Sequence, residues 1–297
     1  MTHAATHQHT LAGPAVVEGV GLHCGRRVRA AILPALAGEG ITFVRTDVQG
    51  DNRIPATVRH VVNTRLNTVI ASASGVSVST IEHLMAALAS LGVDNAVVEV
   101  DGPEVPILDG SAEPFVRLID QAGRRRQQAA RIAIEILEPV EVVHGDKRAS
   151  LTPSARMEMA FEIAFESAAV GRQRIDFAID EASFRAELAD SRTFGFLHEV
   201  DALRRAGLAC GGSLENAVVV DGDRVLNPEG LRRRDEFVRH KALDALGDLY
   251  LLGHPVLGRY EGVCAGHTLN NALTCALMDR PRAFRRRALT PDLVQAD

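Results

Sequence analysis

The chain has 297 residues, of which 46% are hydrophobic and 24% charged, and its formal net charge at pH 7 is −5. This composition is typical of a globular protein long enough for two domains, and it excludes a disordered chain. The acidic balance argues against nucleic-acid binding, and no apolar run reaches the roughly 18 residues of a membrane span. Because the four cysteines are widely spaced and the N-terminus has no signal-peptide pattern, we predict a cytoplasmic protein.

The first half of the chain predicts strands followed by a helix. The segment 13–35 alternates apolar and polar residues around a Gly-rich turn, and segments 41–47 and 56–72 are rich in Val, Ile and Thr. A helix is predicted from Ser79, because Ser79 and Glu82 have the spacing of a capping box, to a stop at Gly92. A strand, a loop and a short helix follow up to residue 123.

The polar and basic run Gly123–Arg131 interrupts this pattern. We predict a solvated linker here, which divides an N-terminal domain of residues 1–126 from a C-terminal domain of residues 127–297. The second domain begins with another block of strands, over residues 132–165.

The rest of the second half predicts a loop with a short helix, a strand pair and two further helices. The strand pair turns at Asp221–Gly222 and leads into a long helix over Asp235–Gly253. We interpret residues 258–278 as a loop and a helix, and Arg285–Arg287 as a solvated end.

The long helix carries a polar face suited to metal binding. His240, Asp244 and Asp248 lie at positions i, i+4 and i+8, so they are stacked on one face, and a carboxylate one turn after a histidine can share an ion with it. Taken alone, the pattern also fits a surface helix with salt bridges. His83 begins a similar Ala/Leu-rich helix in the first half, and this weak repeat predicts two related domains packed face to face, each supplying a histidine.

We therefore predict that His83, His240 and Asp244 bind one catalytic Zn²⁺. Three protein ligands with a fourth position open to water form the catalytic arrangement, whereas a structural zinc has four protein ligands. The metal would lower the pKa of its water and polarise a carbonyl oxygen.

Four further residues complete a hydrolytic mechanism. Glu82, adjacent to a ligand in sequence, is the predicted general base. His267 is the predicted oxyanion stabiliser or general acid, with Asp248 holding its ring in the charged form. The hydroxyl of Thr193 can donate to the oxyanion.

Five stretches of the chain resemble a known family. These are STIEHLMAAL, DGPEVPILDGSA, SRTFGF, LNPEGLRRRDEFVRHKALDALGDLYLLG and GHTLNN. They are similar to those of LpxC, the zinc-dependent UDP-3-O-acyl-N-acetylglucosamine deacetylases of lipid A biosynthesis, and the likeness runs from about Gly19 to about Leu277. The resemblance implies an α+β fold of two similar domains, each a β-sheet layered against α-helices, with the active site in the cleft between them.

The resemblance also implies the reaction and its participants. The N-acetyl amide of a nucleotide-sugar lipid precursor would be hydrolysed to acetate, in the committed step of the pathway, by an enzyme with one Zn²⁺, or Fe²⁺ in the cell. We expect a monomer. The family pattern places the metal and catalytic roles on the residues assigned above, and it makes Lys241 a substrate-contacting lysine.

The acyl-chain passage of the family corresponds to an insert around 190–213, with Phe194 and Phe196. Phe165 matches the residue that stacks on uracil, but the segment Ile163–Ala168 lacks the Asp and His of the family's IDFxHP pattern.

Smaller departures from the family pattern are Arg65, Asn67, Cys24 and Ala265. All of these departures leave two alternatives open. One is a related zinc amidohydrolase acting on another acylated amino sugar, and the other is a non-catalytic binding paralogue.

Overall fold

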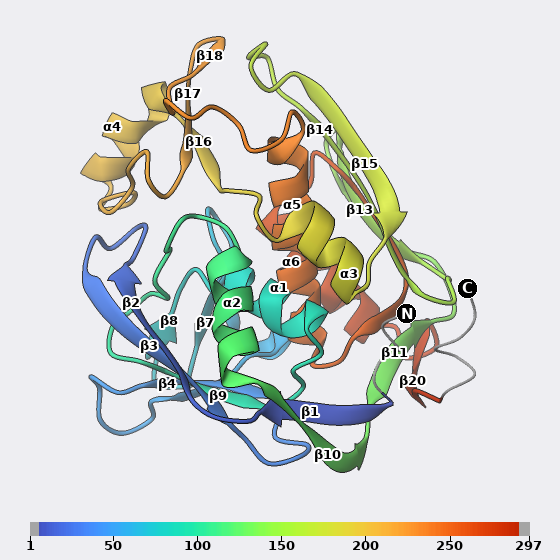
Figure 1. Ribbon diagram of the computed structural model, residues 1–297. Helices are drawn as coiled ribbons and strands as arrows, with labels where there is room; N and C mark the ends of the chain where they lie inside the picture. Colours follow the sequence, from blue (N-terminus) through green and yellow to red (C-terminus); the bar gives the residue numbers. More distant parts are fainter. Residues whose placement is uncertain (1–5, 291–297) are drawn as a thin grey trace.

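The computed structural model describes residues 6–290. Two main β-sheets enclose the central helices, so that in Figure 1 helices α1, α5 and α6 lie between the sheet of β2, β3, β4 and β9 and the sheet of β13, β14 and β15. This arrangement confirms the predicted α+β fold class. Within the described range, no helix has the length and apolar character needed to cross a membrane.

The N-terminal half contains a five-stranded sheet in the order β2-β3-β9-β4-β5 and a small sheet in the order β6-β7-β8. The strands are β2 (Ala15–Val20), β3 (Arg27–Pro34), β4 (Ile41–Arg45), β5 (Arg53–Pro55), β6 (Val61–Asn63), β7 (Val69–Ala71), β8 (Ser77–Val78) and β9 (Ala96–Val100). The helices are the short η1 (Val58–His60), then α1 (Glu82–Ser90) and α2 (Glu113–Ala122).

The C-terminal half contains a seven-stranded sheet in which β19 pairs with β11, β13 and β14, and an insert with its own three-stranded sheet β16-β17-β18. The larger sheet comprises β11 (Ile132–Ile136), β12 (Val140–His144), β13 (Lys147–Thr152), β14 (Met157–Ala164), β15 (Arg172–Ala178), β19 (Val256–Val263) and β20 (Phe284–Ala288). The insert comprises β16 (Phe194–Phe196), α4 (Leu197–Arg205), β17 (Val218–Asp221) and β18 (Arg224–Val225). The remaining helices are α3 (Glu181–Ser183), η2 (Phe184–Leu188), α5 (Glu236–Leu249), η3 (Tyr250–Leu252) and α6 (His267–Met278).

The basic run predicted as a linker is instead a β-strand. Strand β10 (Arg124–Ala130) pairs antiparallel with β1 (His7–Leu11). Its polar side chains are bonded rather than merely solvated, since Arg124 pairs with Glu181 and Gln127 accepts a hydrogen bond from Asn95. The division at residue 126 stays a prediction.

The segments predicted as a loop and a solvated end also contain strands. The loop predicted at the start of residues 258–278 lies in strand β19. A Cβ on Gly258 would lie 2.6 Å from the side chain of Ile136, so the glycine permits close packing within the sheet. In β20, Arg285 and Arg287 both bond Glu135 of the neighbouring strand. The charges therefore cover a sheet edge that the sequence pattern did not reveal.

Helices α1 and α5 cross at Gly247. A Cβ on Gly247 would lie 2.1 Å from the carbonyl oxygen of Glu82, so no larger residue fits without a shift of one helix. This contact of backbones brings the polar faces of the two helices together, and it therefore positions His83 of α1 beside His240 and Asp244 of α5.

Replacing Gly247 by alanine is expected to destabilise the fold by about 1–3 kcal/mol, because overpacking outweighs the gain in helix propensity of about 1 kcal/mol. The melting temperature should fall by several degrees in thermal unfolding. Gly195→Ala, where an added Cβ would meet no atom within 4 Å, is the matched control. An unchanged melting temperature in the Gly247→Ala protein would contradict the proposed packing constraint.

Candidate active site

Helix α5 is buried around nearly its whole circumference. His240, Asp244 and Asp248 are each at most 3% exposed, and the residues on its opposite face are buried as well. The alternative of a surface helix with salt bridges is therefore wrong. Burial of three ionisable groups on one helix is costly unless each finds a partner, so their contacts identify the site.

The predicted capping box at the start of α1 is absent. Ser79 donates its hydroxyl to the carbonyl of Pro103, and helix α1 begins after Ile81 with no side-chain cap. Thr80, between them, has a φ of 57°, which turns the chain out of the geometry that a box requires. Glu82 is thereby free of a capping role. Its carboxylate is buried and accepts a hydrogen bond of 3.1 Å from the backbone N–H of Thr68.

Three side chains from the two helices converge at the crossing. One ligand atom from each of His83, His240 and Asp244 lies within 4.8 Å of the others. The Nε2 atoms of both histidines are 3.4 Å from Oδ1 of Asp244. Ligands bound tetrahedrally at 2.0–2.1 Å are separated by about 3.4 Å, so these distances suit a single metal ion.

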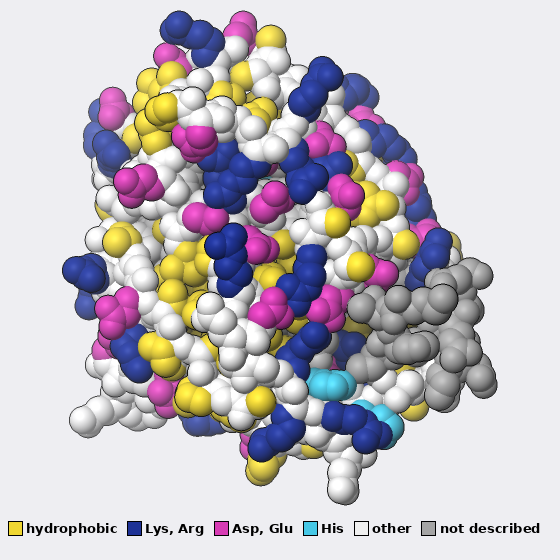
Figure 2. Space-filling model, in the orientation of Figure 1, with side chains coloured by type: hydrophobic (Ala, Val, Ile, Leu, Met, Phe, Trp, Pro, Cys, Tyr) yellow, Lys and Arg dark blue, Asp and Glu magenta, His cyan; other side chains and the backbone are white. Residues whose placement is uncertain are grey.

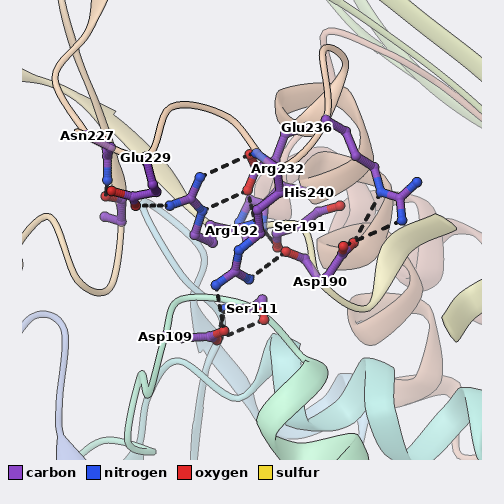
Figure 3. Close-up of polar contacts among 12 residues, drawn as sticks. Asp109, Ser111, Asp190, Ser191, Arg192, Asn227, Glu229, Arg232, Glu236 and His240 are labelled. Carbon is purple, nitrogen blue, oxygen red and sulfur yellow. Dashed lines mark hydrogen bonds and ion pairs between the residues drawn. The ribbon is translucent and has the colours of Figure 1, made fainter. Parts of the chain in front are cut away.

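The donor chemistry of the group also fits a metal. Oδ1 of Asp244 is buried and has no hydrogen-bond partner among the described residues, which is costly unless a cation binds it. His240 bonds the carbonyl of Ser191 through Nδ1 at 3.1 Å, an arrangement that leaves Nε2 for a ligand (Figure 3). Burial lowers the pKa of His240 to about 3, so its ring is neutral at physiological pH.

The second oxygen of Asp244 is held by Lys241. The ammonium lies 2.7 Å from Oδ2, and it lies 5.8 Å from the ring centroid of Phe194. Burial raises the pKa of Asp244, but the neighbouring His240 and Lys241 outweigh this effect and hold that pKa well below its usual range. The carboxylate is therefore ionised and oriented toward the two histidines.

His267, at the first position of α6, faces the same centre. Its Nδ1 donates to Oδ2 of Asp248 at 2.9 Å, and its Nε2 lies 3.9 Å from Oε1 of Glu82. Burial favours the neutral ring, but the charge of Asp248, supported by Glu82 and Asp244, raises the pKa of His267 to about 9. The ring is therefore a cation near neutral pH. Burial raises the pKa of Glu82, which makes its carboxylate a stronger base than an exposed one.

A buried ion-pair network holds the segment 191–193, which precedes β16, next to the metal group. Glu236, at the start of α5, accepts hydrogen bonds from the backbone and the guanidinium of Arg192 and from the backbone of Arg232. The side chain of Arg232 bonds Asp109, which comes from the N-terminal half (Figure 3). Because Ser191 precedes Arg192, this network fixes the carbonyl that orients His240.

The predicted substrate residues lie along the insert beside this network. Thr193 is half-buried, and its backbone bonds Gly110 and Val218. The ring centroid of Phe194 is 6.3 Å from that of His240, while Phe165 lies 5.8 Å from Phe194 and 5.5 Å from Phe196. An aromatic surface thus extends from the metal group to the insert. Figure 2 shows hydrophobic side chains gathered at this end of the molecule.

Sequence reasoning missed three residues of the site. Asn270 donates to Asp248 at 2.9 Å, Thr68 contacts both Asp248 and Glu82, and Gly247 permits the helix crossing. A signal existed for Gly247, since an isolated glycine within a strong helical pattern indicates a packing requirement. No pattern singled out Thr68, because it lies in a bend whose neighbours come from distant parts of the chain.

The sequence matches a known family and several individual relatives over nearly its whole length. The family model for LpxC, UDP-3-O-acyl N-acetylglycosamine deacetylase, matches residues 8–279. The chain is 66% identical over 290 residues to the UDP-3-O-acyl-N-acetylglucosamine deacetylase of Phenylobacterium zucineum (strain HLK1), covering 97% of this chain and 99% of the relative. It is 48% identical over 294 residues to the enzyme of that name from Myxococcus xanthus (strain DK1622), covering 97% and 93%. The one from Neisseria meningitidis (strain FAM18) is 46% identical over 283 residues, covering 94% and 92%.

Proposed function

The chain belongs to the LpxC family of UDP-3-O-acyl N-acetylglycosamine deacetylases, and on that premise we propose that it hydrolyses the N-acetyl amide of UDP-3-O-acyl-N-acetylglucosamine to release acetate in lipid A biosynthesis. The observation that carries the proposal is the convergence of His83, His240 and Asp244 beside an acid–base pair, Glu82 and His267. A metal-dependent amide hydrolase uses a metal group, a base and an acid together in one centre.

The proposed metal is Zn²⁺, with Fe²⁺ able to replace it in the cell. Two imidazoles and one carboxylate suit either ion, because nitrogen ligands are common to both. When bound, such an ion polarises the amide carbonyl and lowers the pKa of a nearby water.

Glu82 is the proposed general base. Its Oε2 is held by the N–H of Thr68, and its Oε1 faces His267, so one carboxylate oxygen is directed into the centre. In that position it can accept the proton of the water that attacks the amide carbon. Burial raises the pKa of Glu82, which strengthens this basicity.

His267 is the proposed acid. As a cation it stabilises negative charge on the former carbonyl oxygen and then donates a proton to the leaving nitrogen. Asp248 and Asn270 hold the ring and its carboxylate partner in place. Thr193, two residues after Ser191 and directly before strand β16, is proposed to donate a further hydrogen bond to the oxyanion.

The basic limb of the pH profile follows from the charge of His267. A reaction that needs the charged ring has full activity below the pKa, which is about 9, and loses activity as the pH rises through that value. A bound divalent cation opposes the charged ring, so we expect the limb at or somewhat below pH 9. Asp248→Asn removes an attractive charge and should move the limb by about 1–3 pH units toward acid. Measurement of kcat/KM against pH for both proteins checks this, and an unmoved limb would refute the assignment.

Substrate recognition is proposed for the insert and its surroundings. Phe194 and Phe196 line an apolar path suited to an acyl chain, and Lys241, bonded to Asp244 through one of its three donors, can give another to the substrate. Phe165 is proposed to stack on uracil. The neighbouring Ser167 and Ala168 bond the turn between β17 and β18, which ties the nucleotide side to the insert.

The test is metal analysis coupled to an acetate-release assay. Purified protein is expected to contain about one metal ion per chain and to release acetate from UDP-3-O-acyl-N-acetylglucosamine.

The altered segment Ile163–Ala168 favours one rival, an amidohydrolase that acts on another acylated amino sugar. Assay of the UDP substrate against the corresponding sugar phosphate separates the two. Equal rates on both would reject nucleotide recognition, and absence of acetate release would reject the proposed reaction.

A further inference from the structure

Thr68 lies where the two halves of the catalytic centre meet. It precedes strand β7, it is 2% exposed, and the groups that it contacts come from helices α1, α5 and α6. A buried hydroxyl group is expected to form hydrogen bonds, so the polar contacts of Thr68 indicate its role.

Both hydrogen-bond donors of Thr68 bond to proposed catalytic groups. Its hydroxyl donates to Oδ1 of Asp248 at 2.5 Å, and its backbone N–H donates to Oε2 of Glu82 at 3.1 Å. The hydroxyl oxygen also lies 3.3 Å from Nδ1 of His267. One residue therefore contacts the base, the histidine and the carboxylate that supports the histidine.

These bonds fix the orientation of both carboxylates. Oδ2 of Asp248 accepts from His267 and Asn270, while Oδ1 accepts from Thr68, so the carboxylate plane cannot rotate without breaking a bond. In the same way, the N–H of Thr68 engages Oε2 of Glu82 and leaves Oε1 facing His267.

The bend that carries Thr68 is itself anchored. Asn67 donates its amide to the hydroxyl of Thr80 at 2.8 Å, and Thr80 donates to Glu104 at 2.8 Å. Glu104 in turn accepts from the backbone of His23 and Cys24 in the first turn of the N-terminal sheet. Thr68 is therefore held by a chain of buried bonds rather than by a mobile loop.

We propose that Thr68 is a positioning residue that sets the geometry between Glu82 and the Asp248–His267 pair. Glu82 can then accept a proton and His267 can donate one from the same arrangement of side chains. The proposal rests on the proposed deacetylase function and extends it to a residue that touches neither the metal group nor, by this assignment, the substrate. Its hydroxyl acts on turnover through Asp248, while its backbone N–H acts through Glu82.

The first experiment separates the hydroxyl from the volume of the side chain. Thr68→Val keeps the shape and the backbone N–H, and it is expected to lower kcat on UDP-3-O-acyl-N-acetylglucosamine by about 10- to 100-fold, with KM and metal content close to wild type. Thr68→Ser restores the hydroxyl and should recover kcat to within about threefold. Thr274→Val is the matched control, since Thr274 is equally buried but bonds only the carbonyl of Asn271.

Wild-type turnover in Thr68→Val, or an equal loss in Thr68→Ser and Thr68→Val, would overturn the proposal, because the hydroxyl would then be dispensable or only the packing would matter. If Thr68→Val fails to fold, the comparison of Thr68→Ser with Thr68→Ala serves the same purpose. In the Asp248→Ala background, Thr68→Val should lower kcat little further, since the group through which it acts is gone. A full additional loss would refute the route through Asp248.

A second measurement does not depend on turnover. The Nδ1–H proton of His267, identified by its loss in His267→Gln, should give a downfield NMR signal in the wild type that shifts in Thr68→Val and returns in Thr68→Ser. An unshifted signal in Thr68→Val would reject the inference even in an active enzyme. If the wild type released no acetate, the proposed function would fail, and this signal would still decide whether Thr68 positions the histidine.

Discussion

Replacing Glu82 by glutamine is expected to lower kcat by about 10²- to 10⁴-fold while the metal content stays that of the wild type. Glutamine keeps the size of the side chain and can still accept the hydrogen bond from Thr68, but it cannot take a proton from water. Because Glu82 lies beside the metal group and is not one of its three ligands, the loss should fall on turnover and leave KM within a few-fold.

The measurement is steady-state acetate release together with metal analysis of the same preparation. Glu113→Gln, a change of the same kind at the start of α2 where the carboxylate bonds only the exposed Arg117, is the control for loss of a negative charge. Turnover in Glu82→Gln equal to that of the wild type would refute the assignment of the base. Loss of the metal along with the activity would place Glu82 in the metal site instead.

Replacing Asp244 by alanine should abolish both metal binding and activity. It removes one of the three ligands and leaves only His83 and His240 to hold the ion, so the affinity should fall by more than the roughly 10- to 100-fold typical of changes around a site. It also frees Lys241, which then lies near the histidines without its partner. Metal content should drop from about one ion per chain toward zero.

Asp248→Asn is the matched control for this experiment, because Asp248 lies one turn further along the same buried helix and bonds His267 rather than the metal group. It should keep the metal, while its turnover at neutral and basic pH falls. Metal analysis after dialysis against a chelator compares the two proteins directly. Full metal retention in Asp244→Ala, or metal loss in Asp248→Asn equal to that in Asp244→Ala, would contradict the ligand assignment.

Local patterns predicted those parts of the molecule that depend on neighbours in sequence. The spacing of His240, Asp244 and Asp248 places them on one face of any helix that contains them, independently of the rest of the fold. All three residues lie in α5. The strand pair turning at Gly222 and the end of α1 before Gly92 follow equally from local backbone preferences, and both glycines have positive φ.

Local rules failed where distant segments competed for the same groups. Ser79 and Glu82 have the spacing of a capping box. The Ser79 hydroxyl instead donates to the carbonyl of Pro103, and the Glu82 carboxylate accepts from the backbone N–H of Thr68. Strands β10, β19 and β20 were missed because their arginines and glycines are unfavourable in an isolated strand. Pairing with β1, β14 and β11 compensates for this unfavourable propensity. The partner strands are distant in sequence, so no local pattern shows this stabilisation.

By itself, the sequence determined the α+β class, the identity of the helices and the set of ionisable residues capable of amide hydrolysis. Only the tertiary structure decided which of these residues share a centre, since the meeting of α1 with α5 depends on the absence of a side chain at Gly247. It also decided their charge states, because burial holds His240 neutral while the adjacent carboxylates keep His267 a cation. The physical reason is the same in both cases: packing distances and desolvation arise between segments remote in sequence, and no periodicity within one segment encodes them.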